Sequence, residues 1–168
     1  MKHICATLLL FCSTETVEQD FIQSIKECAI KWNVIVTEPD RIPIHLVLAQ
    51  SIIESNWGKS RFAKKANNFF GVKAMKGEEY ILSKNNKKIK AYETKCDSVN
   101  DYMDLLSFGE PYKEFKEELL RQWAVDRIDL YAIIEYLENY AEDKKYKIKL
   151  KKIIKQLERM SYEVIAGN

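Results

Sequence analysis

Gln50 and Glu54 are the polar residues whose spacing first suggests chemistry. They lie four residues apart in "IPIHLVLAQSIIES", a nearly all-apolar run, so a helix here places both side chains on one face. Burial and the helix dipole would both raise the pKa of a carboxyl group near the end of such a helix. A carboxylic acid that stays protonated near neutral pH can act as a general acid. From spacing alone, a structural Glu54 that caps the helix or pairs with a Lys or Arg is somewhat more frequent.

Aromatic and amide side chains follow Glu54 closely. An indole such as that of Trp57 suits the apolar face of a sugar ring, and Asn67 and Asn68 offer donors and acceptors for hydroxyl and acetamido groups. Taken singly, each has an ordinary alternative. Trp57, Phe69 and Phe70 fit a hydrophobic core, and an Asn pair often caps a helix or forms a turn.

The elements that must position these residues are mostly helices. Apolar residues recur at spacings of three and four along most of the chain, which is typical of amphipathic helices. A β-hairpin is predicted within 72–92, where apolar and polar residues partly alternate around the turn "KNNKK". The predicted helices cover 17–36, 43–55, 60–65, a segment capped by Asp97 or Ser98, a segment opened by Pro111, 130–137 and 146–157. The expected fold is mainly α, of the α+β kind.

Length and composition favour one globular domain over residues 15–168. The chain has 168 residues, of which 46% are hydrophobic and 31% charged. The net charge of +2 is too small to suggest a nucleic-acid partner. The basic run "KKYKIKLKKIIKQLER" is most simply a solvated helix face, and a weak attraction to an anionic polymer is the alternative.

The N-terminus has the layout of a secretory signal peptide over residues 1–14. Lys2 precedes an apolar run from Ile4 to Cys12, and small residues follow. That run is too short to span a bilayer, so we expect no integral membrane span. A buried N-terminal helix or strand is one alternative, and a lipid-anchored Cys12, which the preceding Phe11 fits poorly, is another. With the signal peptide, the protein would be exported to the periplasm, cell envelope or exterior.

Two cysteines, Cys28 and Cys96, would remain after removal of a signal peptide. They could form one disulfide, but the sequence does not show whether they meet. The chain has no CxxC pair, and its histidines are His3 and His45. This does not favour a zinc site, and we expect no metal.

Three separated segments carry a resemblance to a known family. The stretch "LAQSIIESNWGKSRFAKKANNFFGVKA" closely resembles the signature of the bacterial glucosaminidases of glycoside hydrolase family 73. That signature reads Ala-Gln-x-x-x-Glu-Ser-x-Trp-Gly, then Ser-x-Phe-Ala, then Asn-x-Phe-Gly-x-Lys. "YETKCDSVNDYMDLL" and "ENYAEDKKYKIKLKKII" resemble two later segments, in the family's order. The resemblance covers roughly residues 40–155, and its many spaced identities make it specific.

The resemblance implies a lysozyme-like fold and cleavage of the β-1,4 bond after N-acetylglucosamine in peptidoglycan. It assigns Glu54 as general acid and places Tyr140 in the active site. The implied substrate contacts are Gln50, Trp57, Asn67, Asn68, Phe69, Phe70 and Lys73. The expected partner is a peptidoglycan glycan strand, no cofactor is needed, and we expect a monomer.

One departure from the family concerns a second carboxylate. Many members carry an acid on the hairpin that is proposed to activate water, but the corresponding stretch here is "LSKNNKK". Glu79 or Glu78, at the start of the hairpin, could supply a base if the hairpin folds over the groove. Equally, the acetamido group of the substrate could assist. The stereochemical outcome stays open.

Two other functions fit the same features. A muramidase or lytic transglycosylase of the same architecture also uses a Glu followed by Ser at a helix end, but the Trp-Gly pair and "NNFFG" favour the glucosaminidase. The missing hairpin acid also suits a catalytically silent wall-binding module.

Overall fold

The part of the chain that the structure describes is mainly helical, as predicted, and has one small hairpin. The structure is a computed structural model that describes residues 4–137, 140 and 145–166, with side chains between residues 17 and 160 of those ranges. Its α-helices are α1 (Ile4–Ile35), α2 (Ile44–Ser55), α3 (Arg61–Ala66), α4 (Lys95–Phe108), α5 (Lys113–Trp123), α6 (Leu130–Ile133) and α7 (Tyr146–Ala166). Short 3-10 helices are η1 (Glu38–Asp40), η2 (Glu110–Tyr112) and η3 (Ile134–Tyr136), and the strands are β1 (Tyr80–Leu82) and β2 (Lys88–Lys90).

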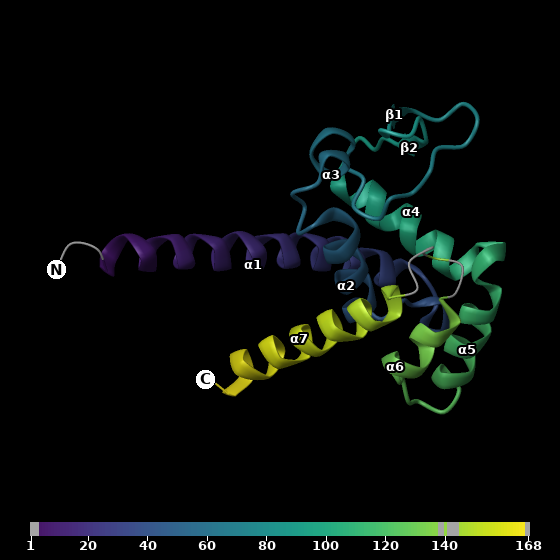
Figure 1. The fold of residues 1–168 in the computed structure, drawn as a ribbon. Coiled ribbons are helices and arrows are strands. Elements are labelled where there is room, and N and C mark those ends of the chain that lie inside the picture. The colour runs from purple at the N-terminus through teal and green to yellow at the C-terminus, as the bar shows by residue number, and fades with distance from the viewer. Residues whose placement is uncertain (1–3, 138–139, 141–144, 167–168) are drawn as a thin grey trace.

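Helix α2 forms the centre of the molecule because it is apolar almost all round. Leu46, Val47 and Ala49 are completely buried. Helices α1 and α7 both pack against it, and Figure 1 shows α2 in the middle with the hairpin at one end. Burying a helix on every side leaves its C-terminal end as the place where a polar side chain can reach the surface. That end carries Glu54.

Helix α1 begins earlier than predicted, at Ile4, and so extends over most of the segment predicted as a signal peptide. That segment's side chains lie outside the described residues, and the signal peptide stays a prediction. Within the ranges that the structure describes, no helix combines the length and the apolar character needed to cross a membrane.

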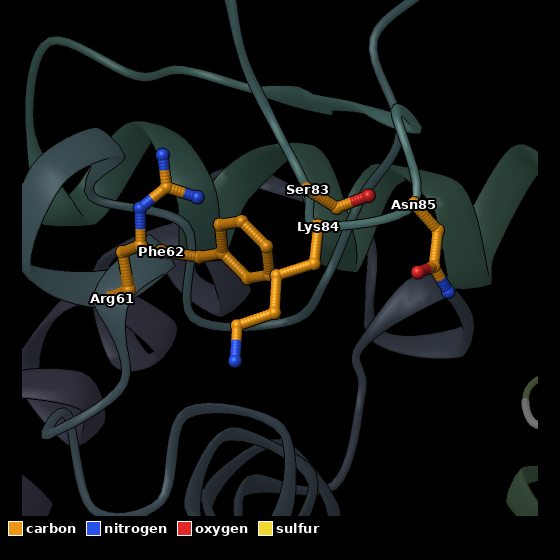
Figure 2. A pocket seen from close by; sticks show the side chains of 5 residues that line it. All are labelled: Arg61, Phe62, Ser83, Lys84 and Asn85. Carbon is orange, nitrogen blue, oxygen red and sulfur yellow. The ribbon is translucent and has the colours of Figure 1, made fainter.

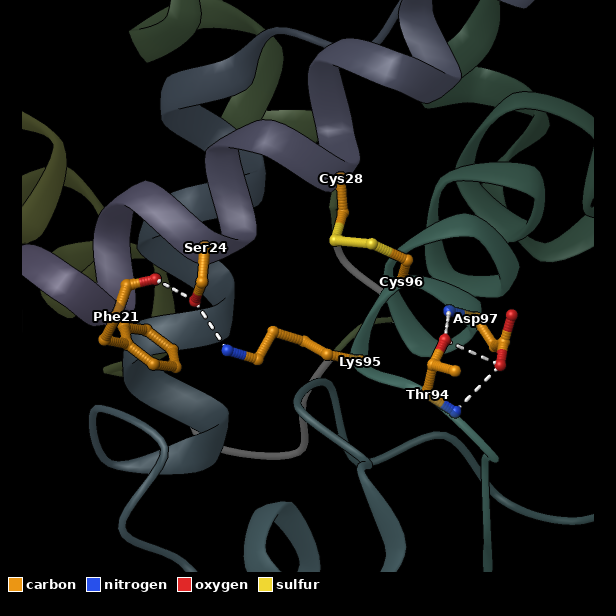
Figure 3. The surroundings of a disulfide bond; sticks show 7 residues. All are labelled: Phe21, Ser24, Cys28, Thr94, Lys95, Cys96 and Asp97. Carbon is orange, nitrogen blue, oxygen red and sulfur yellow. Dashed lines mark hydrogen bonds between the residues drawn. A yellow bond between two sulfur atoms is a disulfide. The ribbon is translucent and has the colours of Figure 1, made fainter.

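The N-terminus of α4 corrects one prediction. Its cap is Thr94, not Asp97 or Ser98, and the helix begins at Lys95. The Thr94 hydroxyl accepts from the Asp97 backbone N–H at 3.2 Å, and the Asp97 carboxylate accepts from the Thr94 N–H at 2.8 Å (Figure 3). This reciprocal capping box satisfies two backbone donors that would otherwise lack partners.

The hairpin is short and depends on the chain that leads into it. Tyr80 pairs with Lys90 in the antiparallel register, and a bridge between Lys73 and Ile89 adds a third segment beside β2. Asn86 has the left-handed φ of 56° that the turn between the strands requires. A two-stranded hairpin alone is marginal in water, so the extra segment helps to hold it in place.

A disulfide joins Cys28 of α1 to Cys96 of α4, which answers the question that the sequence left open. The two Cα atoms are 5.1 Å apart and 68 residues apart in the chain. Beside it, the Lys95 ammonium donates to the Ser24 hydroxyl at 2.6 Å (Figure 3). Closing a loop of this length is worth roughly 4 kcal/mol of chain entropy in the unfolded state.

Candidate active site

A groove of about 480 Å³ lies between the hairpin and the helical body. The loop 70–78 and the end of β2 line it from one direction, and α4, Tyr112 and Tyr140 line it from the other. We call this cavity the groove. It brings together segments from four separate parts of the chain, so it exists only in the folded protein.

Glu54 lies at the edge of the groove, next to Gly71. A Cβ atom built on Gly71 would be 3.5 Å from Glu54 Oε2, and Gly71 itself lines the groove. The φ of Gly71 is +70°, which favours glycine at this close approach. Glu54 is half-buried, so part of the residue stays accessible to a bound molecule.

Burial raises the pKa of Glu54, and a hydrogen bond from Tyr146 lowers it by less, so the net shift is upward. The direction agrees with the prediction made from the apolar helix. A neighbouring Lys or Arg is not among the causes of the shift, which weighs against the structural ion pair. A protonated carboxyl at the edge of a groove can donate a proton to a leaving group.

Tyr140 contacts Phe70 and Tyr146 in the neighbourhood of Glu54. Its hydroxyl donates to the Phe70 carbonyl oxygen at 3.1 Å, and its ring stacks on Tyr146 with a centroid distance of 5.4 Å. Burial raises its pKa well above the usual range, so it is a neutral donor at physiological pH. Since Phe70 precedes Gly71, this bond also fixes the loop that passes Glu54.

Glu78 and Glu79 stand in different surroundings. Glu78 lines the groove, where its carboxylate accepts from the Met75 N–H at 2.7 Å and pairs with the Lys90 ammonium at 2.7 Å. The bond from Lys90, followed by that from Met75, lowers the pKa of Glu78. The side chain of Glu79 is exposed and does not line the groove. Of the two, only Glu78 lines the groove, and its lowered pKa makes it an ionised carboxylate there.

Asp101 is a groove residue that the sequence analysis did not select. Its Oδ2 lies 3.0 Å from the Lys90 ammonium and accepts from the Tyr92 hydroxyl at 2.5 Å. Lys90 thus bridges Asp101 and Glu78, and the groove holds two carboxylates around one cation. Asp101 belongs to the "SVNDY" segment already noted for its resemblance, and this was the available signal.

The family model for Glucosaminidase, described as mannosyl-glycoprotein endo-beta-N-acetylglucosaminidase, matches residues 36–159, which is most of the chain. The chain belongs to this family. The matched range contains Glu54, Glu78, Asp101 and Tyr140 and agrees with the span of the resemblance. Family membership therefore covers the whole groove.

Two known relatives of this glucosaminidase-family chain are similar to it over part of their own length. Protein bax of Escherichia coli (strain K12) is 29% identical over 113 residues, 67% of this chain and 41% of that protein. Exo-glucosaminidase LytG of Bacillus subtilis (strain 168) is 27% identical over 164 residues, 91% of this chain and 57% of that protein. The chain thus spans about half the length of these two relatives.

A solved structure confirms the expected lysozyme-like fold of the family. The glycoside hydrolase domain of FlgJ from Salmonella typhimurium superposes with a TM-score of 0.65 at 26% identity, covering 88% of this chain and 92% of that chain.

Three predicted substrate contacts use their amides inside the protein instead. Asn68 is buried, and its amide donates to the Val72 and Lys90 carbonyls at 2.9 and 2.8 Å. Asn67 ends α3 with a φ of 48° and donates to two backbone carbonyls after β2. Gln50 is completely buried between two tyrosines. In this glucosaminidase-family chain all three amides therefore bond within the protein, and none of the three residues lines the groove.

The predicted aromatic contacts divide between core and groove. Trp57 and Phe69 both pack on Phe21, with centroid distances of 6.3 and 6.0 Å. Phe70 stacks on Tyr102 at 3.9 Å and also lines the groove. Lys73 is exposed at the rim of the groove. Of the predicted substrate contacts, Phe70 and Lys73 therefore line the groove.

A second cavity of about 330 Å³ lies between α3 and the hairpin turn. Figure 2 shows Phe62 at its centre, with Arg61 on one side and Ser83, Lys84 and Asn85 on the other. The Arg61 guanidinium donates to the Leu82 carbonyl at 2.8 Å and so ties the hairpin to α3. This cavity shares no lining residue with the groove. In the part of the chain that the structure describes, no cluster of three or more His, Cys, Asp or Glu could hold a metal.

Proposed function

We propose that this chain is a glycoside hydrolase that cleaves the β-1,4 bond after N-acetylglucosamine in peptidoglycan. The observation that carries the proposal is Glu54, a carboxyl with a raised pKa at the edge of a groove. Family membership supports the activity, and the relatives named exo-glucosaminidase LytG and peptidoglycan hydrolase FlgJ support the substrate.

In the proposed mechanism, Glu54 protonates the glycosidic oxygen as the bond to the sugar breaks. A second group must then stabilise the developing positive charge or activate water. Glu78 suits the role of base because its carboxylate is ionised and faces the groove. Tyr140 and Phe70 border the space where the sugar would lie.

The nature of the new chain end tests the proposal. Purified peptidoglycan is digested with the protein, and the soluble products are analysed by mass spectrometry after borohydride reduction. A reduced N-acetylglucosamine end is expected. A reduced muramic acid end would show a muramidase, and an anhydro-muramyl product would show a lytic transglycosylase, and either would overturn the proposal.

Export is also proposed. The Cys28–Cys96 disulfide supports it, because disulfides persist mainly in oxidising compartments. Alkylation of the protein in intact cells, with and without prior reduction, measures the oxidised fraction. A fully reduced pair in the native cell would contradict export.

We also propose that the protein is a monomer, and light scattering after gel filtration tests this.

A further inference from the structure

Positive charge gathers around the second cavity, the one between α3 and the hairpin turn. Helix α3 and residues 80–90 together carry seven Lys or Arg residues and no Asp or Glu, although the whole chain has a net charge of only +2. Lys90 pairs with acids on the groove side of the hairpin. At the turn, Lys84 and Lys87 are exposed, and among the residues that the structure describes neither has a carboxylate partner. The uncompensated charge therefore lies at the turn end of the hairpin, beside the cavity.

The second cavity combines an apolar floor with a cationic rim. The half-buried Phe62 ring lies at its centre, between Arg61 and Lys84 (Figure 2). Arg61 Cζ lies 5.7 Å from the centre of that ring, so the guanidinium is held over an aromatic face. A guanidinium has five N–H donors, and the described hydrogen bonds use the one that reaches the Leu82 carbonyl. A ligand can thus meet free donors, an ammonium group and an apolar surface together.

We propose that the second cavity binds the terminal carboxylate of a peptide carried by peptidoglycan, with the alkyl side chain of the last peptide residue against Phe62. The inference rests on the proposed function, because it gives the same substrate a second point of attachment. N-acetylglucosamine units are neutral, whereas a free peptide end carries a carboxylate, and only the carboxylate complements the charge of the rim. The flat fork of a guanidinium such as that of Arg61 also matches the two oxygens of a carboxylate.

The hairpin sets the distance between the second cavity and the groove. Tyr80 of β1 pairs with Lys90, which lines the groove, and Ser83, which lines the second cavity, is three residues further along the chain. A strand rises about 3.3 Å per residue, so roughly 10 Å separates the two. A peptide of a few residues spans that distance, since an extended chain covers about 3.3–3.6 Å per residue. One strand of peptidoglycan can therefore place its glycan in the groove and a peptide end in the second cavity.

Two small probes that differ by one charge test the proposal. They are N-acetyl-D-alanyl-D-alanine and the same compound with its C-terminal carboxyl group amidated. At low salt the protein should bind the acid at least about fivefold more tightly than the amide, and the ratio should fall toward one as salt screens the rim. Titration followed by NMR measures both affinities and locates the probe, with shifts expected at residues 61–62 and 83–85. Equal affinity for the two probes, or shifts confined to groove residues such as Lys73 and Tyr112, would overturn the proposal.

Two lysines of the hairpin turn provide a matched pair of variants. Lys84→Gln removes a charge from the rim, so the preference for the acid should drop by at least about threefold. Lys87→Gln removes the same charge from the same turn, but Lys87 does not line the second cavity, so its preference should stay within about 1.5-fold of wild type. An equal loss in both variants would show a diffuse attraction to a basic surface and would overturn the proposal.

The probe titration does not depend on catalysis, so this inference and the proposed function can fail separately. If wild type releases N-acetylglucosamine ends but binds both probes equally, only the role of the second cavity is wrong. If wild type releases no such ends but prefers the acid, and Lys84→Gln loses that preference, the carboxylate site is correct and the proposed function is wrong.

Discussion

Glu54 and Glu78 are identical side chains beside one groove, but their surroundings differ in nearly every respect. Around Glu54 lie the neutral hydroxyls of Tyr140 and Tyr146, and we call this part the tyrosine side. Around Glu78 lie Lys90 and Asp101, and we call this part the hairpin side. Burial raises the pKa of the first carboxyl, whereas a cation lowers that of the second.

With the proposed roles of Glu54 and Glu78, this difference would give one groove an acid and a base at the same pH. The tyrosine side rests on α2, α4 and α7, where α7 packs against α2 and α1 packs against both α2 and α4. The hairpin side rests on ion pairs that are partly exposed to water. Water screens such pairs, so the hairpin side should tolerate amino-acid substitutions better than the tyrosine side.

Removal of the acid should have the largest effect. Glu54→Gln keeps the shape of the side chain but cannot protonate a leaving group, so kcat/KM on peptidoglycan should fall by about 10³ or more. Release of reducing ends measures the rate, and circular dichroism verifies the fold. Glu117→Gln, on the exposed face of α5, is the control and should keep wild-type activity.

Equal activity in Glu54→Gln and wild type would remove Glu54 from the mechanism. Absence of activity in the wild type on every wall substrate would favour the silent wall-binding module.

On the hairpin side, variants of Glu78 and Glu79 should show which of the two carboxylates acts as the base. Glu78→Gln should lower kcat by about 10², because it removes the ionised carboxylate from the groove. Glu79→Gln should stay within about twofold, since that side chain is exposed outside the groove. Initial rates on soluble glycan fragments measure both. Full activity in Glu78→Gln would favour assistance by the acetamido group of the substrate.

The tyrosine side was largely predictable because its central feature is local. A carboxyl at the end of an apolar helix has a raised pKa wherever that helix is buried, and the sequence shows both the helix and its Glu54. What the sequence could not show is that Gln50 faces inward to Tyr102 and Tyr146, which are 52 and 96 residues away. An amide has the same donors and acceptors whether it meets a sugar or a tyrosine.

The hairpin side was predicted only in part because it is assembled from distant segments. Alternation and turn residues located the hairpin, but they do not show that α4 passes beneath it and adds Asp101 to the groove. The predicted N-cap of α4 was wrong for a different reason. Thr94 and Asp97 have the spacing of a capping box, so local reasoning could have found the correct start of the helix.

Lys90 should control the acid limb of the pH profile. Its ammonium is the first cause of the lowered pKa of Glu78, and Glu78 acts as a base only above that pKa. Lys90→Met should therefore raise the pKa and move the acid limb of kcat upward, by about one pH unit. The alkaline limb, which reports Glu54, should stay in place. A shift of both limbs would show that the two sides are coupled.

The disulfide should affect stability more than either side of the groove. Cys96 lies in the first turn of α4, five positions before Asp101, and Cys28 lies on α1 away from the groove residues. Replacing both cysteines with Ala should lower the free energy of unfolding by about 2–4 kcal/mol, because the unfolded chain regains its entropy. Urea unfolding at 25 °C measures this loss. Activity at that temperature should remain within about twofold, and both limbs of the pH profile should be unmoved, because helix packing still holds α4 in place. A displaced acid limb with an unmoved alkaline limb would instead show that the link between α1 and α4 positions the hairpin side alone.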